Sequence, residues 1–146
     1  MKVKKFLSSV VVLVTLFASA IPLRADTTSF SVSAGGSQYS SGVTMTSNRS
    51  QYRAVLHWFE FWGLGKDHAP TSTTVIHVRP YKVLSSGNYE KASDVVSNFT
   101  CCDKSTWGKT ASLKSGYGNI GNTLCLKTNS DYSLKGYYCE IQWYFL

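Results

Sequence analysis

The sequence predicts an all-β protein, a small antiparallel β-sandwich or barrel of about seven to nine short strands. Apolar and polar residues alternate over short segments, and these segments are rich in β-branched and aromatic residues. Glycine-rich breaks separate them at short intervals. The length of 146 residues suits one domain. Charged residues make up 16% and aromatic residues 14%, which excludes a coiled coil and argues against intrinsic disorder.

Residues 1–25 are predicted to be a cleavable signal peptide, and residues 26–146 a single β domain. Three lysines within the first five residues precede an apolar run at residues 6–20, and small residues follow. The run is shorter than the roughly 20 residues that span a bilayer, which favours cleavage over a retained anchor. Cleavage after Ala25 fits best, and cleavage after Ala20 is the alternative. We therefore expect a secreted, extracellular protein.

The formal net charge of +7 overstates the charge of the domain. Residues 1–25 hold four of the 15 cations and none of the eight acids, which leaves 11 cations against eight acids, or +3. No run of lysine or arginine marks a basic face of the kind that binds nucleic acid. We therefore expect no nucleic-acid partner.

Two short strands are predicted near the start of the domain. Phe30, Val32 and Ala34 alternate with serines, the pattern of a half-buried strand. The glycine pair at residues 35–36 ends this strand, and residues 43–46 form the second.

Residues 52–62 are the most apolar segment of the domain and are predicted to form a strand. Apolar side chains occupy both the even-numbered and the odd-numbered positions. The even-numbered ones are Ala54, Leu56, Trp58 and Trp62, and the odd-numbered ones are Val55, Phe59 and Phe61. This is typical of a central strand covered on both faces, or of a strand with one exposed face that binds a ligand.

The middle of the domain is predicted to alternate between loops and strands. Residues 63–72 form a loop, and residues 73–78 form a strand that Pro80 ends or restricts to a sheet edge, because proline has no amide proton. Three segments follow: strands at residues 94–100 and 109–114, and a glycine-rich loop at residues 116–122.

The last two strands are predicted to pair as a hairpin. Residues 123–128 and 136–145 both alternate, and the polar residues 129–131 lie between them. The final strand is predicted to be buried and aromatic-rich, with one face made of Tyr137, Cys139, Ile141, Trp143 and Phe145.

Four cysteines in an exported chain predict two disulfides: Cys101, Cys102, Cys125 and Cys139. Three connectivities are possible. Adjacent cysteines in an extended chain point to opposite faces, which disfavours a vicinal bridge. We favour Cys101 and Cys102 each pairing with Cys125 or Cys139. A zinc site is the alternative, but the spacing lacks the CxxC pairs of structural zinc sites, so no metal is expected.

His57 and His77 are the candidates for acid/base chemistry, with Glu60 and Arg79 nearby in sequence. Nothing in the sequence fixes their mutual geometry, and no nucleophile elbow or phosphate-binding loop is present. We assign no catalytic residue and no cofactor, and favour a protein without catalytic activity. A small secreted hydrolase or nuclease remains a minor alternative.

The aromatic residues give the strongest functional indication. The candidate contact residues are Trp58, Phe59, Phe61, Trp62 and Trp107. The alternative is that these rings fill the core of a small sandwich. We expect a non-catalytic binder of a cell-surface component, namely a glycan, a membrane or a protein. A membrane-active, bacteriocin-like toxin is the second hypothesis. The sequence leaves the oligomeric state open.

Overall fold

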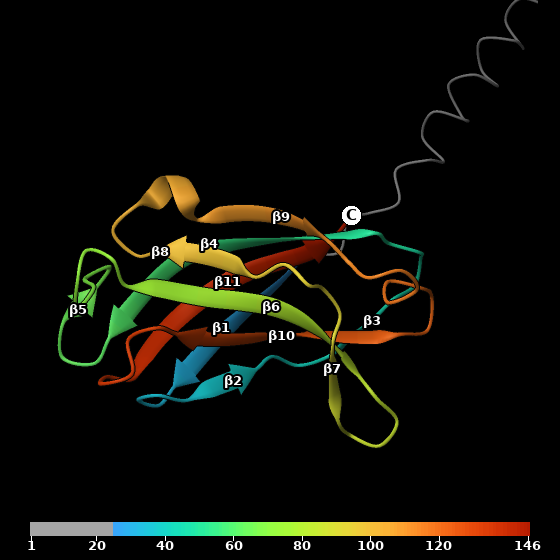
Figure 1. The fold of residues 1–146 in the computed structure, drawn as a ribbon, viewed down its shortest axis with the longest axis horizontal. Helices are drawn as coiled ribbons and strands as arrows, with labels where there is room; N and C mark the ends of the chain where they lie inside the picture. The colour runs from blue at the N-terminus through green and yellow to red at the C-terminus, as the bar shows by residue number, and fades with distance from the viewer. Residues whose placement is uncertain (1–24) are drawn as a thin grey trace, which may run out of the picture.

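The computed structural model describes residues 25–146, which form two antiparallel β-sheets that pack together as a β-sandwich (Figure 1). The predicted all-β class is confirmed. The signal-peptide prediction falls on residues outside the described part, apart from Ala25. The strands are β1 (Ala25–Val32), β2 (Ser37–Tyr39), β3 (Val43–Thr44), β4 (Gln51–Phe61), β5 (Gly65–Lys66), β6 (Val75–Val83), β7 (Tyr89–Lys91), β8 (Ser97–Thr100), β9 (Gly108–Ser112), β10 (Thr123–Ser130) and β11 (Tyr137–Phe145).

A single turn of 3-10 helix, η1 (Lys104–Thr106), precedes β9. Within the described residues, no helix is long and apolar enough to cross a membrane. The first sheet, sheet A, has the order β1-β11-β4-β5, with β9 also paired to β4. The second, sheet B, has the order β2-β10-β6-β7, with β3 paired to β10 and β8 paired to β6.

The predicted C-terminal hairpin is wrong, because β10 and β11 lie in different sheets. β10 pairs with β6, whereas β11 lies between β1 and β4. Residues 131–136 therefore cross from one sheet to the other (Figure 1). The alternation predicted for the last strand is confirmed, since its odd-numbered residues from Tyr137 to Phe145 are all buried.

A β-bulge explains why β4 is apolar at both parities. Glu140 of β11 pairs with Trp58, but the next residue, Ile141, pairs with Leu56, so His57 is an extra residue in β4. The side chains that point into the core are even-numbered before the bulge and odd-numbered after it. The buried residues of the strand are Tyr52, Ala54 and Leu56 before the bulge and Phe59 and Phe61 after it.

Pro80 lies inside β6 and does not end the strand, which corrects the prediction for this residue. β8 pairs with residues 75–78 and β7 with residues 81–83, so Pro80 falls at the break between these two partners. The nitrogen of a strand residue faces the same side as its carbonyl. The Pro80 carbonyl accepts a hydrogen bond from Ala92 on that side (3.0 Å), so the missing amide proton breaks no ladder bond.

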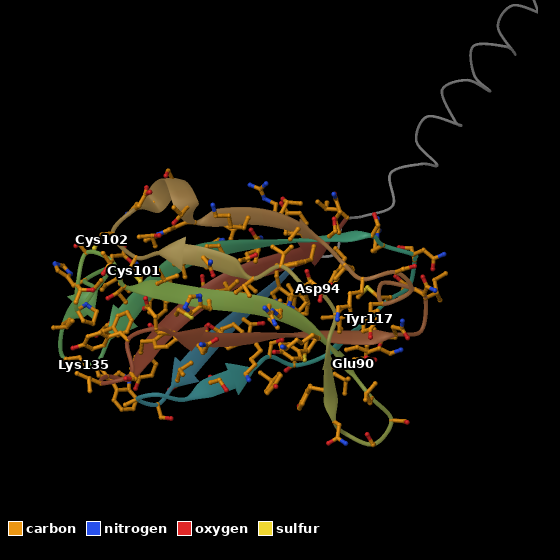
Figure 2. All side chains as sticks on the ribbon, viewed as in Figure 1. Glu90, Asp94, Cys101, Cys102, Tyr117 and Lys135 are labelled. Carbon is orange, nitrogen blue, oxygen red and sulfur yellow. The ribbon has the colours of Figure 1, made fainter. Side chains whose placement is uncertain are left out.

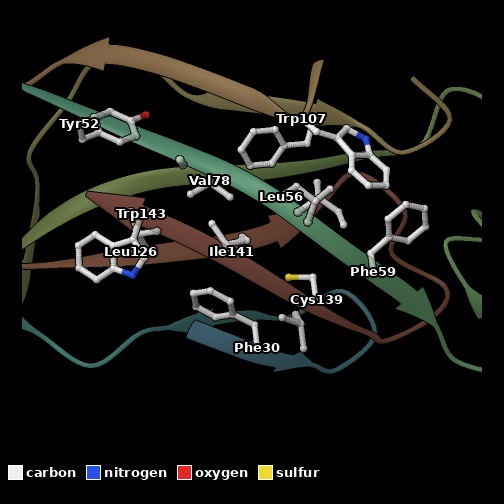
Figure 3. Close-up of a cluster of buried hydrophobic side chains, with 14 of the residues drawn as sticks. Phe30, Tyr52, Leu56, Phe59, Val78, Trp107, Leu126, Cys139, Ile141 and Trp143 are labelled. Atoms are coloured by element: carbon white, nitrogen blue, oxygen red, sulfur yellow. The ribbon is translucent and has the colours of Figure 1, made fainter. Parts of the chain in front are cut away.

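The core lies between the two sheets and is dominated by aromatic rings (Figure 3). Its largest fully buried side chains include Trp143, Tyr52, Tyr137, Phe30, Phe59, Phe61 and Phe99. The two buried tyrosine hydroxyls of the core have partners: the Tyr52 hydroxyl lies 2.8 Å from Ser97 Oγ, and the Tyr137 hydroxyl lies 3.0 Å from Thr128 Oγ1.

Candidate ligand-binding groove

Three of the five predicted contact residues belong to the core. Phe59 and Phe61 have no exposed surface and Trp107 is 7% exposed. Phe59 meets both other rings edge-on, at centroid distances of 6.0 Å to Phe61 and 5.7 Å to Trp107. The bulge turns these phenylalanines inward, which corrects their prediction as contact residues. Trp58 and Trp62 point to the outer face of sheet A, where Trp58 is half-buried and Trp62 is 43% exposed.

All four cysteines are free thiols in the structure, which does not contain the two predicted disulfides. The Cys101 amide donates to the Thr74 carbonyl (2.9 Å) at one end of β6, whereas Cys125 pairs with Tyr81 near the other end. Seven residues of strand separate these positions, roughly 23 Å at about 3.3 Å per residue. A disulfide requires Cα atoms within roughly 7 Å. Neither Cys101 nor the adjacent Cys102, labelled at one end of the sandwich in Figure 2, can therefore reach Cys125.

The thiols also differ in environment. Cys102 is exposed, and the other three are buried. Burial raises the pKa of Cys101 to about 12 and that of Cys125 to about 11, and it raises the pKa of Cys139 as well. The buried thiols are therefore protonated and unreactive at neutral pH. Among the described residues, no three His, Cys, Asp or Glu side chains form a group that could hold a metal ion.

The two strand histidines lie on opposite outer faces of the sandwich. His57 is at the bulge on sheet A, with Nδ1 3.8 Å from Glu140 Oε1. His77 is on sheet B, with Nδ1 2.8 Å from Asn98 Oδ1. Because the core separates them, they cannot act together as an acid/base pair. The hydrolase hypothesis loses the residue pair on which it depended.

A groove of about 790 Å³ crosses the outer face of sheet B. Its floor is formed by β6 and β10. The turn between β1 and β2 and the first residue of β2 line one side, and β7, β8 and the segment between them line the other. The turn is tight, with Gly35 in the left-handed region at a φ of 66°. The groove is therefore framed by five strands and two of their connections.

Cross-strand register brings cations and tyrosines together at the centre of this groove. Lys127 of β10 pairs directly with Arg79 of β6 on one side and with Tyr39 of β2 on the other. Directly paired residues project from the same face of a sheet. The ammonium nitrogen of Lys127 lies 5.3 Å from the ring centre of Tyr39 and 5.8 Å from that of Tyr81, both within cation–π range.

Imidazole and amide groups form the neighbouring row of the groove. His77 pairs with Asn129 of β10 and with Asn98 of β8. In the row on the other side of the cations, Tyr81 pairs with Lys91 of β7. The floor therefore combines amide, imidazole, phenol, ammonium and guanidinium groups within three successive rows.

The positive charge of the groove is not balanced. The described lining contains Arg79, Lys91 and Lys127 but no aspartate or glutamate. Within residues 25–146, the lysines that form ion pairs are Lys104 and Lys114, and the other close nitrogen–carboxylate contact joins His57 to Glu140. In addition, Nε of Arg79 is buried with no hydrogen-bond partner among the described residues. Unpaired cations in a concave surface produce a positive potential that attracts anions.

A tyrosine stack borders the cations. The rings of Tyr39 and Tyr89 stack at a centroid distance of 3.9 Å, and Tyr81 meets Tyr39 edge-on at 5.5 Å. Tyr89 is 45% exposed. The stack holds Tyr39 in place beneath the ammonium group of Lys127 and keeps that charge at the centre of the groove.

The groove was not predicted from the sequence. His77, Arg79 and Tyr81 alternate with buried residues of β6, so their shared outward face was recognisable from period-two spacing alone. Their pairing with Lys127 and Asn129 was not recognisable, because β10 was expected to pair with β11.

Fold and groove define a class: a small β-sandwich domain with a basic, aromatic-bordered groove on one sheet. No family model and no curated protein matches the sequence. Among solved structures, the chain is similar to the crystal structure of Yersinia pseudotuberculosis-derived mitogen, with a TM-score of 0.47 and 9% sequence identity. The similarity covers 84% of this chain and 86% of that chain.

Proposed function

We propose that the protein is a non-catalytic binder that holds an acidic cell-surface polysaccharide in the groove on sheet B. The observation that carries this proposal is the unbalanced positive charge of the groove, where Arg79, Lys91 and Lys127 have no acidic neighbour in the described lining. The predicted export of the chain supports a ligand at the cell surface. The proposal keeps the binding role expected from the sequence and moves it from the aromatic segment to sheet B.

The chemistry of the groove suits a sugar acid. A guanidinium group binds a carboxylate through two parallel hydrogen bonds, and Arg79 lines the groove with no acidic residue in the described lining. Asn98 and Asn129 flank the cations and offer both donors and acceptors to hydroxyl groups. A polymer of acidic sugars presents both kinds of group along its length.

Single-stranded nucleic acid fits the groove less well. Such ligands stack their bases on open aromatic faces along a basic channel. The Tyr39 ring is already covered by Tyr89 at 3.9 Å and lies under the Lys127 ammonium group. The Tyr39 ring is therefore not free to stack on a base.

Affinity electrophoresis with the purified protein tests the proposal. The gels contain polygalacturonate or hyaluronate as acidic polysaccharides, dextran as a neutral one, or single-stranded RNA. We expect retardation by the acidic polysaccharides that weakens as salt rises. In the double variant Arg79→Met with Lys127→Met we expect affinity to fall at least about tenfold, since a charged hydrogen bond contributes about 1.5–3 kcal/mol.

The matched control is Lys104→Met, which removes one exposed cation outside the groove and should leave binding unchanged. Three results contradict the proposal: no retardation of the wild type by either acidic polysaccharide, equal retardation of the double variant, or tighter binding to RNA than to both polysaccharides.

A further inference from the structure

The outer face of sheet A carries a second exposed set of aromatic side chains. Past the bulge, Trp58, Glu60 and Trp62 point outward from the end of β4. Trp62 is 43% exposed and Tyr138 of β11 is 44% exposed, and their ring centres lie 6.1 Å apart. Exposed rings at this spacing form a continuous aromatic surface of the kind that marks a binding site.

The Trp62 ring is held in position by the start of β11. The Trp62 amide donates to the Gly136 carbonyl (3.0 Å), and Lys135 Nζ donates to the Trp62 carbonyl (3.2 Å). A side chain at Gly136 would place its Cβ 2.7 Å from the indole ring and 2.6 Å from the Val32 carbonyl oxygen. The indole therefore rests on the backbone at Gly136. A ring fixed in this way loses little conformational entropy when a ligand covers it.

Rings alternate with carboxylates and hydroxyls over this face. Tyr138 pairs with Glu60 on one side and with Ser31 of β1 on the other. In the next row, Glu140 pairs with Trp58 and with a second serine of β1. The aromatic faces can stack on the C–H face of a pyranose ring, while the carboxylates and hydroxyls can bond to its hydroxyl groups.

Each carboxylate on this face has a nitrogen neighbour. Glu60 is the cross-strand partner of Lys66, and Glu140 Oε1 lies 3.8 Å from His57 Nδ1. Lys135 is held at the Trp62 carbonyl, and Arg53 lies at the far end of the face opposite Tyr144, so no cluster of cations like that of the groove surrounds Trp62 and Tyr138. A bilayer would have to bury both carboxylates, which is costly. The chemistry of the face is therefore complementary to an uncharged, hydroxyl-rich ligand.

We infer that the outer face of sheet A is a second binding surface that takes a neutral polysaccharide, centred on Trp62 and Tyr138. This surface and the groove lie on opposite outer faces of the sandwich and share no residue. The inference is independent of the acidic ligand proposed for sheet B, and its failure would leave that proposal intact.

The test is affinity electrophoresis of the purified protein in gels that contain laminarin, hydroxyethyl cellulose, mannan or dextran. We expect at least one of these neutral polymers to retard the wild type, and Trp62→Ala and Tyr138→Ala each to weaken the interaction about tenfold. Tyr144→Ala is the matched control, because Tyr144 lies on the same face of the same strand, opposite Arg53 and away from Trp62. The groove variant Arg79→Met should bind neutral polymers as the wild type does.

Circular dichroism and urea unfolding verify that each variant is folded, as expected for substitutions of exposed rings. The inference is overturned if none of the four polymers retards the wild type, or if Trp62→Ala and Tyr138→Ala bind as tightly as Tyr144→Ala. Sedimentation with phosphatidylglycerol vesicles tests whether the face binds a membrane instead. Binding to vesicles that depends on Trp62, in the absence of polysaccharide binding, also overturns it.

Discussion

Arg79 and Lys127 are direct cross-strand partners on β6 and β10, so two cations face each other on the floor of the groove. Like charges in directly opposite positions destabilise a sheet. Here Lys127 is held over Tyr39 and Tyr81, while the Nε–H of Arg79 is buried without a partner. Repulsion of this kind is relieved when an anion binds between the two groups.

Arg79→Met should therefore make the protein more stable while it weakens binding of acidic polysaccharide. The substitution keeps an unbranched apolar stem in place of the arginine methylenes, and it removes both the repulsion and the unpaired buried donor. We expect the free energy of unfolding to rise by about 0.5–1 kcal/mol. Urea unfolding measures the change, with Lys104→Met as the control. A loss of stability in Arg79→Met would show that the guanidinium group has a structural role.

Phe59→Ala should cost about 3–5 kcal/mol of stability, because the ring is fully buried between Phe61 and Trp107. Leu134→Ala is the comparison, since Leu134 is apolar but 78% exposed. That change should stay within about 0.5 kcal/mol. The measurement is urea unfolding followed by tryptophan fluorescence. Similar, small effects of both substitutions would contradict the placement of Phe59 in the core.

Gly136→Ala should displace the Trp62 ring, because the new Cβ would overlap both the indole and the Val32 carbonyl oxygen. We expect a loss of about 1–3 kcal/mol, typical of overpacking, and weaker binding of neutral polysaccharide. Gly108→Ala is the control, since its Cβ would approach only the flexible tip of Arg53, at 3.2 Å. Equal stability of the two variants in urea would mean that Gly136 does not seat the indole.

Stability should fall as the pH rises above about 9, the ordinary pKa of a thiol. Burial raises the pKa of Cys101 to about 12 and that of Cys125 to about 11 in the folded protein. Between the ordinary thiol pKa and these raised values, the folded state binds more protons than the unfolded state. The stabilising contribution of the protonated thiols is therefore complete below about pH 9 and is lost progressively as the pH rises above it.

Urea midpoints measured from pH 7 to pH 11 follow this loss. Cys125→Ala should show a shallower fall than the wild type. Leu134→Ala, which removes an exposed apolar side chain and no thiol, should show the same fall as the wild type. A midpoint that stays constant up to pH 11 would be inconsistent with three buried, protonated thiols.

The alternation of apolar and polar residues predicted where strands lie better than it predicted which strands pair with each other. The alternation of residues 137–145 correctly identified the buried face of β11. Sequence neighbours often pair, which favoured a hairpin with β10, but long-range pairing placed β11 between β1 and β4. The groove depends on such pairing, because residues near position 78 and residues near position 128 meet only in the folded sheet.

Phe59 and Phe61 were wrongly predicted as contact residues for a related reason. Period-two counting assigns Trp58 to the face of Leu56, and only the extra residue at His57 places the tryptophan on the opposite face. A bulge has no fixed sequence signature. The sequence therefore indicated an aromatic-rich strand but not which of its rings lie inside.

This bulge has a consequence for how the gene can vary. Deleting the codon for His57 would restore regular alternation in β4, and one half of the strand would then have to turn inside out. Either Tyr52, Ala54 and Leu56 would face water, or Phe59 and Phe61 would. β4 therefore cannot lose even one residue without exposing core side chains to water. Length changes that leave the fold intact should instead accumulate in exposed turns such as residues 85–88.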